Sequence, residues 1–265
     1  EFFGVAHDVR LTSNNQNIFS KIYWTLANED KNCSVSGIKL RGDLVTYNQY
    51  QYDGEENTLE NDISSSDHIL EKINSANKNE NIKAIVIEVD SGGGSPVAGE
   101  EISNVVSNSR KPVVSYIRSI GASASYLSIS GADKIFASKY SDIGGIGVTA
   151  SYLSNVNKNN KDGYTYEQLS VGKFKDSGDP NKPLTEEERS LFMRDANIIY
   201  DDFVKMVADN RGLPITKVRI IADGSTVLGQ KAKELGLIDE IGGIEEAKKY
   251  LEEITEEDLV ICWGE

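Results

Sequence analysis

Residues 81–90 (NIKAIVIEVD) form an apolar run of strand length, and a glycine triplet at 92–94 follows it directly. A run that is apolar at successive positions predicts a strand buried on both faces, as in a parallel sheet. Further apolar runs alternate with helical patterns: we expect strands over 111–117 and 133–138, and helices over 96–108 and 122–131. This alternation is typical of an α/β fold with a mainly parallel sheet and flanking helices.

A long helix is expected in the second half of the chain. Thr185 is followed three residues later by Glu188, which is the pattern of a capping box. The helix that it opens should end near Arg211 and Gly212. Five apolar residues fall on one face of it at helical spacing: Phe192, Ala196, Ile199, Phe203 and Val207. We expect this face to pack against the core and not to form a cofactor site.

Two segments carry little periodic pattern. Residues 1–34 show only a possible helix around 17–28, and residues 47–62 are polar, acidic and rich in tyrosine. A segment without an apolar face has little to bury in a core. We expect neither segment to contribute a central element of the fold.

The charge balance argues against nucleic acid as a partner. The chain has 42 acidic and 28 basic residues, for a net charge of −14. Phosphate binding requires a basic stripe, and the sequence contains none. We assign the acidic excess to solubility.

No apolar run approaches the ~20 residues that a membrane-spanning helix needs. The sequence as given is therefore expected to be soluble. It begins with Glu1 and not with Met, so we expect that an N-terminal signal or membrane anchor precedes it in the native protein.

The two cysteines, Cys33 and Cys262, lie near opposite ends of the chain. Neither stands in a spacing typical of a metal site, and we expect no metal. The sequence leaves open whether they form a disulfide or remain free thiols.

Acyl-bond hydrolysis needs a nucleophile, a base and amide donors for the oxyanion. The glycine triplet can present a backbone N–H without a side chain in the way, although glycine turns after strands are common. Ser123 stands at the start of the short helix expected after strand 111–117, among small residues (GASAS). There it would be a nucleophile with the N–H of Ala124 as an oxyanion donor, or simply the cap of the helix.

A histidine base is not expected. His7 lies in the weakly patterned N-terminal segment and His68 lies on a polar helix. Lysine can serve instead if burial lowers its pKa from about 10.4 toward neutrality. Lys175, in the run GKFKD, is the candidate, although a lone lysine is ordinarily a solvated residue.

Six segments of the sequence form a joint pattern whose order and spacing cover about residues 35–251. The segments are DSGGG at 90–94, IGASASY at 120–126, ADKIFA at 132–137, GGIGV at 144–148, GKFKD at 172–176, and the stretch from IADG at 221 to GLIDE at 236–240. Taken together, they resemble the signal peptide peptidase A family, and the joint match is more specific than any one motif.

The resemblance implies a Clp-protease/crotonase-like fold of ββα repeats and a serine–lysine dyad without a cofactor. Its nucleophile falls on Ser123 and its general base on Lys175. Its oxyanion donors fall on Gly93 and Ala124, and the substrate-binding loop includes Gly92 and Gly94.

The resemblance also implies how such a protein is organised in the cell. Residues 35–255 would be the peptidase domain, preceded by an N-terminal extension (1–34) and followed by a C-terminal tail (256–265). Family members work outside the cytoplasm at the cell membrane, through an anchor absent from this sequence, on remnant signal peptides and other apolar peptides. They form ring- or dome-shaped homo-oligomers, in which serine and lysine are expected to come from neighbouring subunits.

Three positions depart from the family pattern. Gly92 replaces a proline in the glycine loop, Gly145 replaces a serine that could orient the lysine, and Ser125 replaces a common glycine. Two other functions therefore stay open: a non-catalytic peptide-binding scaffold, and a crotonase-like acyl-CoA enzyme, which uses a similar glycine loop.

Overall fold

The computed structural model describes residues 33–47 and 63–263. The possible helix at 17–28 and nearly all of the polar segment 47–62 lie outside the described residues. Every helix and strand expected from the alternating pattern is present, with boundaries that differ by a few residues.

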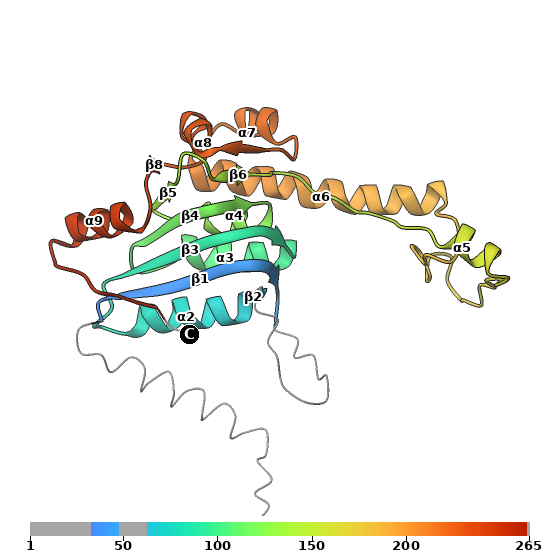
Figure 1. Ribbon diagram of the computed structural model, residues 1–265, viewed down its shortest axis with the longest axis horizontal. Helices are drawn as coiled ribbons and strands as arrows, with labels where there is room; N and C mark the ends of the chain where they lie inside the picture. The colour runs from blue at the N-terminus through green and yellow to red at the C-terminus, as the bar shows by residue number, and fades with distance from the viewer. Residues whose placement is uncertain (1–32, 48–62, 264–265) are drawn as a thin grey trace, which may run out of the picture.

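The described residues build one mainly parallel sheet with the strand order β2-β1-β3-β4-β5-β8 (Figure 1). The paired strands along this path are all parallel. β9 pairs parallel with the start of β1, and β6 joins β4 in parallel and β7 in antiparallel orientation. The strands are β1 Val35–Val45, β2 Ile63–Ser65, β3 Ala84–Gly94, β4 Val113–Ala122, β5 Lys134–Ala137, β6 Asp142–Gly144, β7 Thr226–Leu228, β8 Glu240–Ile241 and β9 Ile261–Trp263.

Strand β3 is buried on both faces, as its apolar run predicts. Ile85 and Ile87 belong to the larger core cluster, under helices α2, α3 and α4 and the C-terminal half of α6. Val86 points to the opposite face, into a smaller cluster that α9 covers. The helices are α2 Ser66–Lys78, α3 Pro96–Ser107, α4 Ala124–Ile129, α5 Val156–Lys161, α6 Glu186–Arg211, α7 Ile215–Ile221, α8 Gly229–Leu235 and α9 Ile244–Thr255.

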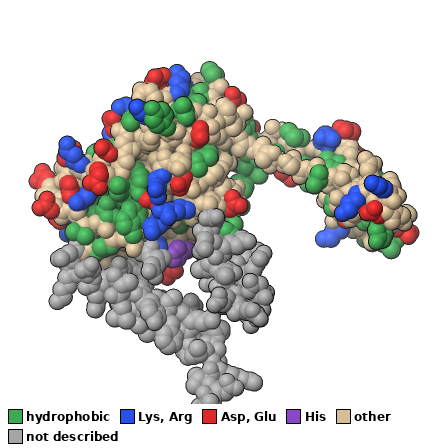
Figure 2. Space-filling model, viewed as in Figure 1, with side chains coloured by type: hydrophobic (Ala, Val, Ile, Leu, Met, Phe, Trp, Pro, Cys, Tyr) green, Lys and Arg blue, Asp and Glu red, His purple; other side chains and the backbone are tan. Residues whose placement is uncertain are grey.

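An arm extends from this body (Figure 1). It consists of α5, the loops around it and the N-terminal half of α6. The capping box of Thr185 and Glu188 opens α6, and Gly212 ends it in the left-handed conformation, as expected. Figure 2 shows acidic and basic side chains mixed over the arm and the body.

The expected packing of the apolar face of α6 is only half right. Phe203 and Val207 are buried, but Phe192, Ala196 and Ile199 are partly exposed. The reason is that the N-terminal half of α6 leaves the body, so no layer of the fold lies over these side chains. They line a cavity instead.

Part of the expected C-terminal tail 256–265 is joined to the sheet. Residues 261–263 form β9, which pairs with β1, and Cys262 is disulfide-bonded to Cys33. Both ends of the described chain are thus fixed to the same strand. No helix in the described part of the chain is long and apolar enough to cross a bilayer.

Candidate active site

Ser123 occupies a strained turn between β4 and α4. Its backbone has φ 53° and ψ −131°, a conformation that costs a non-glycine residue on the order of 1–3 kcal/mol. The turn is held by a hydrogen bond of 2.8 Å from the Ser123 N–H to the carbonyl of Gly144. Ser123 is the N-cap residue of α4, but its hydroxyl makes no capping hydrogen bond, so a capping role does not account for a serine at this position. A sharp strand-to-helix turn of this kind is how α/β hydrolases expose a nucleophilic serine.

The glycine loop lies against this turn. A Cβ atom on Gly93 would stand 2.8 Å from the Cβ of Ser123 and 3.0 Å from the nitrogen of Ala124. A Cβ on Gly94 would meet the carbonyl oxygen of Leu44 at 2.2 Å. Glycine is therefore needed at both positions for the loop to fit between β1 and Ser123. The structure thus brings together Gly93, Ser123 and Ala124.

Backbone amides near Ser123 could stabilise an oxyanion. The N–H of Ala124 is the first of α4, so it has no acceptor within the helix. The N–H of Gly93 donates to the hydroxyl of Ser91 at 3.1 Å, and that hydroxyl donates to the carbonyl of Gly42 at 2.6 Å. An oxyanion would therefore share the Gly93 N–H with the hydroxyl of Ser91 or displace that hydroxyl from it.

The second hydroxyl of the turn, that of Ser125, is not available for catalysis. Its side chain is fully buried. The hydroxyl donates its one proton to the carbonyl oxygen of Ser91 at 2.6 Å, with the carbonyl oxygen of Ala122 also in reach at 2.8 Å, and it accepts from the Ala122 N–H at 3.0 Å. Ser125 thus ties the nucleophile turn to the glycine loop.

Gly145 lies on the other side of the nucleophile turn, with φ 56°. A Cβ at this position would stand 3.2 Å from the Cβ of Ala122 and 3.3 Å from the nitrogen of Ser123. A serine at position 145 would therefore be strained and tightly packed, so this departure from the family pattern suits the local backbone.

A cavity of about 780 Å³ opens at Ser123. Ser123, Ala124 and Leu127 form one wall, and residues 147–150 and the α6 residues between 192 and 206 form others. Its lining is mostly apolar, with three carboxylates (Glu100, Asp195 and Asp202) and one ammonium, that of Lys205, which is paired with Asp209 at 2.6 Å. The contribution of α6 to the cavity was not predicted, although the helical spacing of its apolar residues is visible in the sequence.

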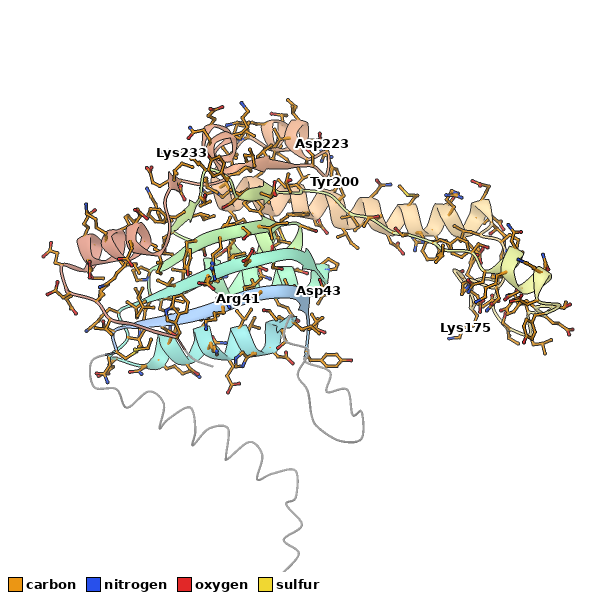
Figure 3. All side chains as sticks on the ribbon, in the orientation of Figure 1. Arg41, Asp43, Lys175, Tyr200, Asp223 and Lys233 are labelled. Carbon is orange, nitrogen blue, oxygen red and sulfur yellow. A yellow bond between two sulfur atoms is a disulfide. The ribbon has the colours of Figure 1, made fainter. Side chains whose placement is uncertain are left out.

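Lys175 does not reach this cavity within one copy of the chain. It lies at the far end of the arm (Figure 3), in a turn closed by a hydrogen bond of 3.1 Å from its N–H to the carbonyl of Gly172. Its side chain is exposed and is not part of the cavity wall. The structure brings Ser123 to the oxyanion donors but leaves the predicted base apart from them.

The described histidine, His68, does not replace it. His68 lies on α2 and is not part of the cavity wall, and burial together with the charge of Lys72 lowers its pKa. His7 lies outside the described residues. Among the described residues, no cluster of three or more His, Cys, Asp or Glu side chains could hold a metal ion.

The fold is that of the Clp protease. A solved structure of a point mutant of ClpP1 from Listeria monocytogenes superimposes with a TM-score of 0.51 at 13% identity, covering 85% of this chain and 98% of the other. At that identity the likeness concerns the fold alone.

Sequence relatives are named as proteases. A putative protease of Methanocaldococcus jannaschii is 37% identical over 180 residues, 67% of this chain and 58% of that protein. A putative signal peptide peptidase of Enterococcus faecium is 30% identical over 197 residues, 73% of this chain and 57% of that protein. The matched regions thus span less than two thirds of the length of these relatives.

A family model matches as well. The model of peptidase family S49 covers residues 106–258, which include both Ser123 and Lys175. Because this match extends over more than half of the sequence, the chain belongs to peptidase family S49, the signal peptide peptidase A family that its motifs indicated.

Proposed function

We propose that this chain is a serine endopeptidase that uses Ser123 as nucleophile and Lys175 as general base. The observation that carries the proposal is the setting of Ser123. It is held in a strained turn at the wall of a large cavity, with the backbone of Gly93 and Ala124 beside it. The resemblance of segment 120–126 to the family motif supports the same residue.

The mechanism follows from these groups. The neutral amine of Lys175 takes the proton of the Ser123 hydroxyl, and Oγ attacks the carbonyl carbon of the scissile bond. The N–H groups of Ala124 and Gly93 stabilise the oxyanion that forms. When the C–N bond breaks, the proton passes to the leaving amine. Water then hydrolyses the acyl-enzyme by the same route and frees Ser123.

Lys175 would come from a second copy of the chain. In one copy it stands at the end of the arm, away from Ser123, so a dyad requires a neighbour that inserts its own arm. Apolar side chains on the arm support such an assembly, because solvent-exposed apolar groups in this number mark an interaction surface. They include Leu153, Tyr164, Leu169, Val171 and Met193, each more than half exposed. The assembly would be a ring- or dome-shaped homo-oligomer.

Apolar peptides are the proposed substrates. The cavity wall offers Leu127, Phe192 and Ile199 to apolar side chains, and the relative from Enterococcus faecium is named a putative signal peptide peptidase. We therefore propose remnant signal peptides as the natural substrate class. Action at the outer side of a cell membrane is part of this proposal, and the Cys33–Cys262 disulfide is consistent with an oxidising compartment.

The test is cleavage of a fluorogenic apolar peptide by wild type, Ser123→Ala, Lys175→Ala and the control Lys173→Ala. Lys173 lies two residues from Lys175 and is also exposed, but it pairs with Glu187. We expect Ser123→Ala and Lys175→Ala to be inactive and Lys173→Ala to cleave at the wild-type rate. A 1:1 mixture of the two inactive variants, dissociated and reassembled, should recover about a quarter of the wild-type rate, since about one junction in four joins an intact serine to an intact lysine.

Other outcomes identify other functions. Inactive wild type that still binds peptides would make the chain a binding scaffold. Activity retained in Lys175→Ala, together with acyl-CoA binding, would favour a crotonase-like enzyme. Loss of activity in both Ser123→Ala and Lys175→Ala, without recovery in their mixture, would place serine and lysine in the same copy.

A further inference from the structure

The tip of the arm, residues 151–190, is built without an apolar core. All of its residues are described, and the only buried side chain among them is that of Glu188, which is 3% exposed. Burying a carboxylate is unfavourable unless it is hydrogen-bonded and paired. The partners of Glu188 must therefore determine how the tip is held.

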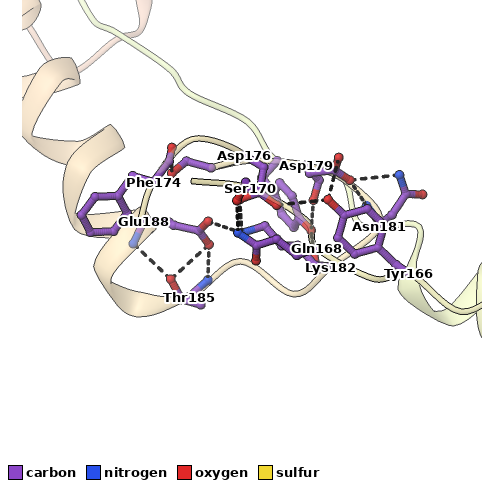
Figure 4. Close-up of polar contacts among 12 residues, drawn as sticks. Tyr166, Gln168, Ser170, Phe174, Asp176, Asp179, Asn181, Lys182, Thr185 and Glu188 are labelled. Carbon is purple, nitrogen blue, oxygen red and sulfur yellow. Dashed lines mark hydrogen bonds and ion pairs between the residues drawn. The ribbon is translucent and has the colours of Figure 1, made fainter. Parts of the chain in front are cut away.

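Glu188 has two sets of partners (Figure 4). One carboxylate oxygen accepts hydrogen bonds from the N–H and the hydroxyl of Thr185, at 2.9 and 3.0 Å. The other accepts from the ammonium of Lys182 at 2.5 Å. This bond and the nearby Asp176 carboxylate raise the pKa of Lys182, so the ammonium stays charged.

Lys182 connects the start of α6 to the loop that carries the proposed base. Its ammonium lies 3.6 Å from a carboxylate oxygen of Asp176, and both side chains are less than a fifth exposed. Asp176 also accepts hydrogen bonds from Gln168 at 2.5 Å and from the hydroxyl of Tyr166 at 3.1 Å. Tyr166 shares its hydroxyl with Asp179 at 3.3 Å.

Asp176 is the residue directly after Lys175. Fixing the Asp176 side chain fixes the peptide next to Lys175, while the Lys175 side chain stays exposed and extends from the tip. A lysine that must meet a serine on another subunit depends on such an anchor. A displacement of about 1 Å in a catalytic group can lower the rate on the order of 100-fold.

We propose that Lys182 is a positioning residue for the general base, acting through its contacts with Asp176 and Glu188. This inference rests on the proposed function, in which Lys175 is that base. Lys182 touches neither the substrate nor Ser123. It determines where the tip places the Lys175 amine.

The arm contains a matched control. Lys173 and Glu187 form an ion pair of 2.6 Å on the same loop and helix, but both side chains are more than 60% exposed. Exposed ion pairs contribute little to the stability of a fold. Lys173→Met removes one positive charge near Lys175 without touching Asp176 or Glu188.

The experiment compares the assembled wild type with Lys182→Met, Lys182→Arg, Lys173→Met and Lys175→Ala. The measurements are kcat and KM for the fluorogenic peptide, the melting temperature and the oligomer size. We expect Lys182→Met to lower kcat on the order of 10–100-fold, because the amine spends less time at the serine. KM should change by less than about threefold, because the substrate-binding cavity is untouched.

Two further results are expected. Lys182→Arg, which keeps the charge and can contact both carboxylates, should retain most of the wild-type rate. Lys173→Met should behave as wild type.

The proposal is overturned if Lys182→Met matches Lys173→Met, or if Lys182→Arg loses as much activity as Lys182→Met. Activity in Lys175→Ala would show that Lys175 is not the general base, and this would overturn the proposed function and not only the role of Lys182. If Lys182→Met does not assemble, Tyr166→Phe and Gln168→Ala each remove one donor to Asp176. Each should lower kcat with KM unchanged, and wild-type kinetics in both would overturn the proposal.

Discussion

The hydroxyl of Ser125 donates a hydrogen bond of 2.6 Å to the carbonyl of Ser91, across the gap between the nucleophile turn and the glycine loop. Replacing Ser125 by alanine removes this bond and leaves a buried carbonyl without it, at a cost of about 1–3 kcal/mol. We expect a lower urea midpoint together with a lower kcat, because the spacing between Gly93 and Ser123 is no longer fixed. Ser128→Ala is the control, since its hydroxyl bonds only the carbonyl of Ala124 within α4. Equal kinetics in both variants would contradict the role of Ser125.

A substitution at Gly92 is expected to raise stability and kcat instead of lowering them. A Cβ at this position meets nothing within 4 Å, and Gly92 is not among the glycines with positive φ. Gly92→Pro should therefore stabilise the protein by about 0.4–1 kcal/mol, by restricting the unfolded chain. It should also raise kcat, because the Gly93 amide is held more rigidly. Gly92→Ala separates the effect of a side chain from that of the ring, and a slower Gly92→Pro enzyme would show that the loop must move.

How much of the fold and of the candidate site could be predicted from the sequence depends on how far apart in the chain the interacting residues lie. The strand at 81–90 and the turn at Ser123 follow from local pattern. A strand buried on both faces is apolar at successive positions, and a tight turn requires small residues next to one another. The capping box of Thr185 and Glu188 is equally local. These features therefore appear where the sequence placed them.

The features that could not be predicted depend mostly on contacts between distant segments. The spacing of Phe192 and Ile199 shows that α6 has an apolar face but not what lies opposite that face. In this fold a cavity lies there. Strand β9 pairs with β1 across nearly the whole chain, and three residues carry too little pattern to reveal it. The hydrogen bond from Gly93 to Ser91 depends on loop geometry. The position of Lys175 depends on the direction of α6, which no local signal specifies.

Acid should weaken the sheet through Glu88. Burial opposes ionisation of this carboxyl, but hydrogen bonds from Tyr116 and Arg41 and the charge of Arg118 outweigh it and lower its pKa below 4.5. A lowered pKa means that the stabilisation is complete above the unfolded value of about 4.5 and is lost as pH falls through the folded value. We expect the free energy of unfolding to fall below pH 4.5 in wild type, and to fall less in Glu88→Gln. Parallel curves for the two proteins would assign the acid sensitivity to other carboxyls.

The disulfide between Cys33 and Cys262 should contribute measurably to stability. It closes a loop with a sequence separation of 229 residues and holds β9 on β1. The double variant Cys33→Ser/Cys262→Ser should lose about 2–4 kcal/mol in urea unfolding. Reductant should lower the midpoint of the wild type toward that of the variant and leave the variant unchanged. A wild-type midpoint that does not respond to reductant, at full reduction by thiol titration, would contradict this role.

The carboxylates at the cavity should select for positive charge beside an apolar segment. Asp195 is paired with Arg194 at 2.8 Å, whereas Glu100 forms no ion pair in the described part of the chain. A peptide with lysine next to the apolar segment should therefore be cleaved faster than its glutamate counterpart, by about three- to tenfold at low salt. Glu100→Gln combined with Asp202→Asn should lower this ratio while leaving the rate on a neutral peptide unchanged, because the apolar wall is intact. A ratio that is the same in the variant, or that does not fall with added salt, would show that these carboxylates do not contact the substrate.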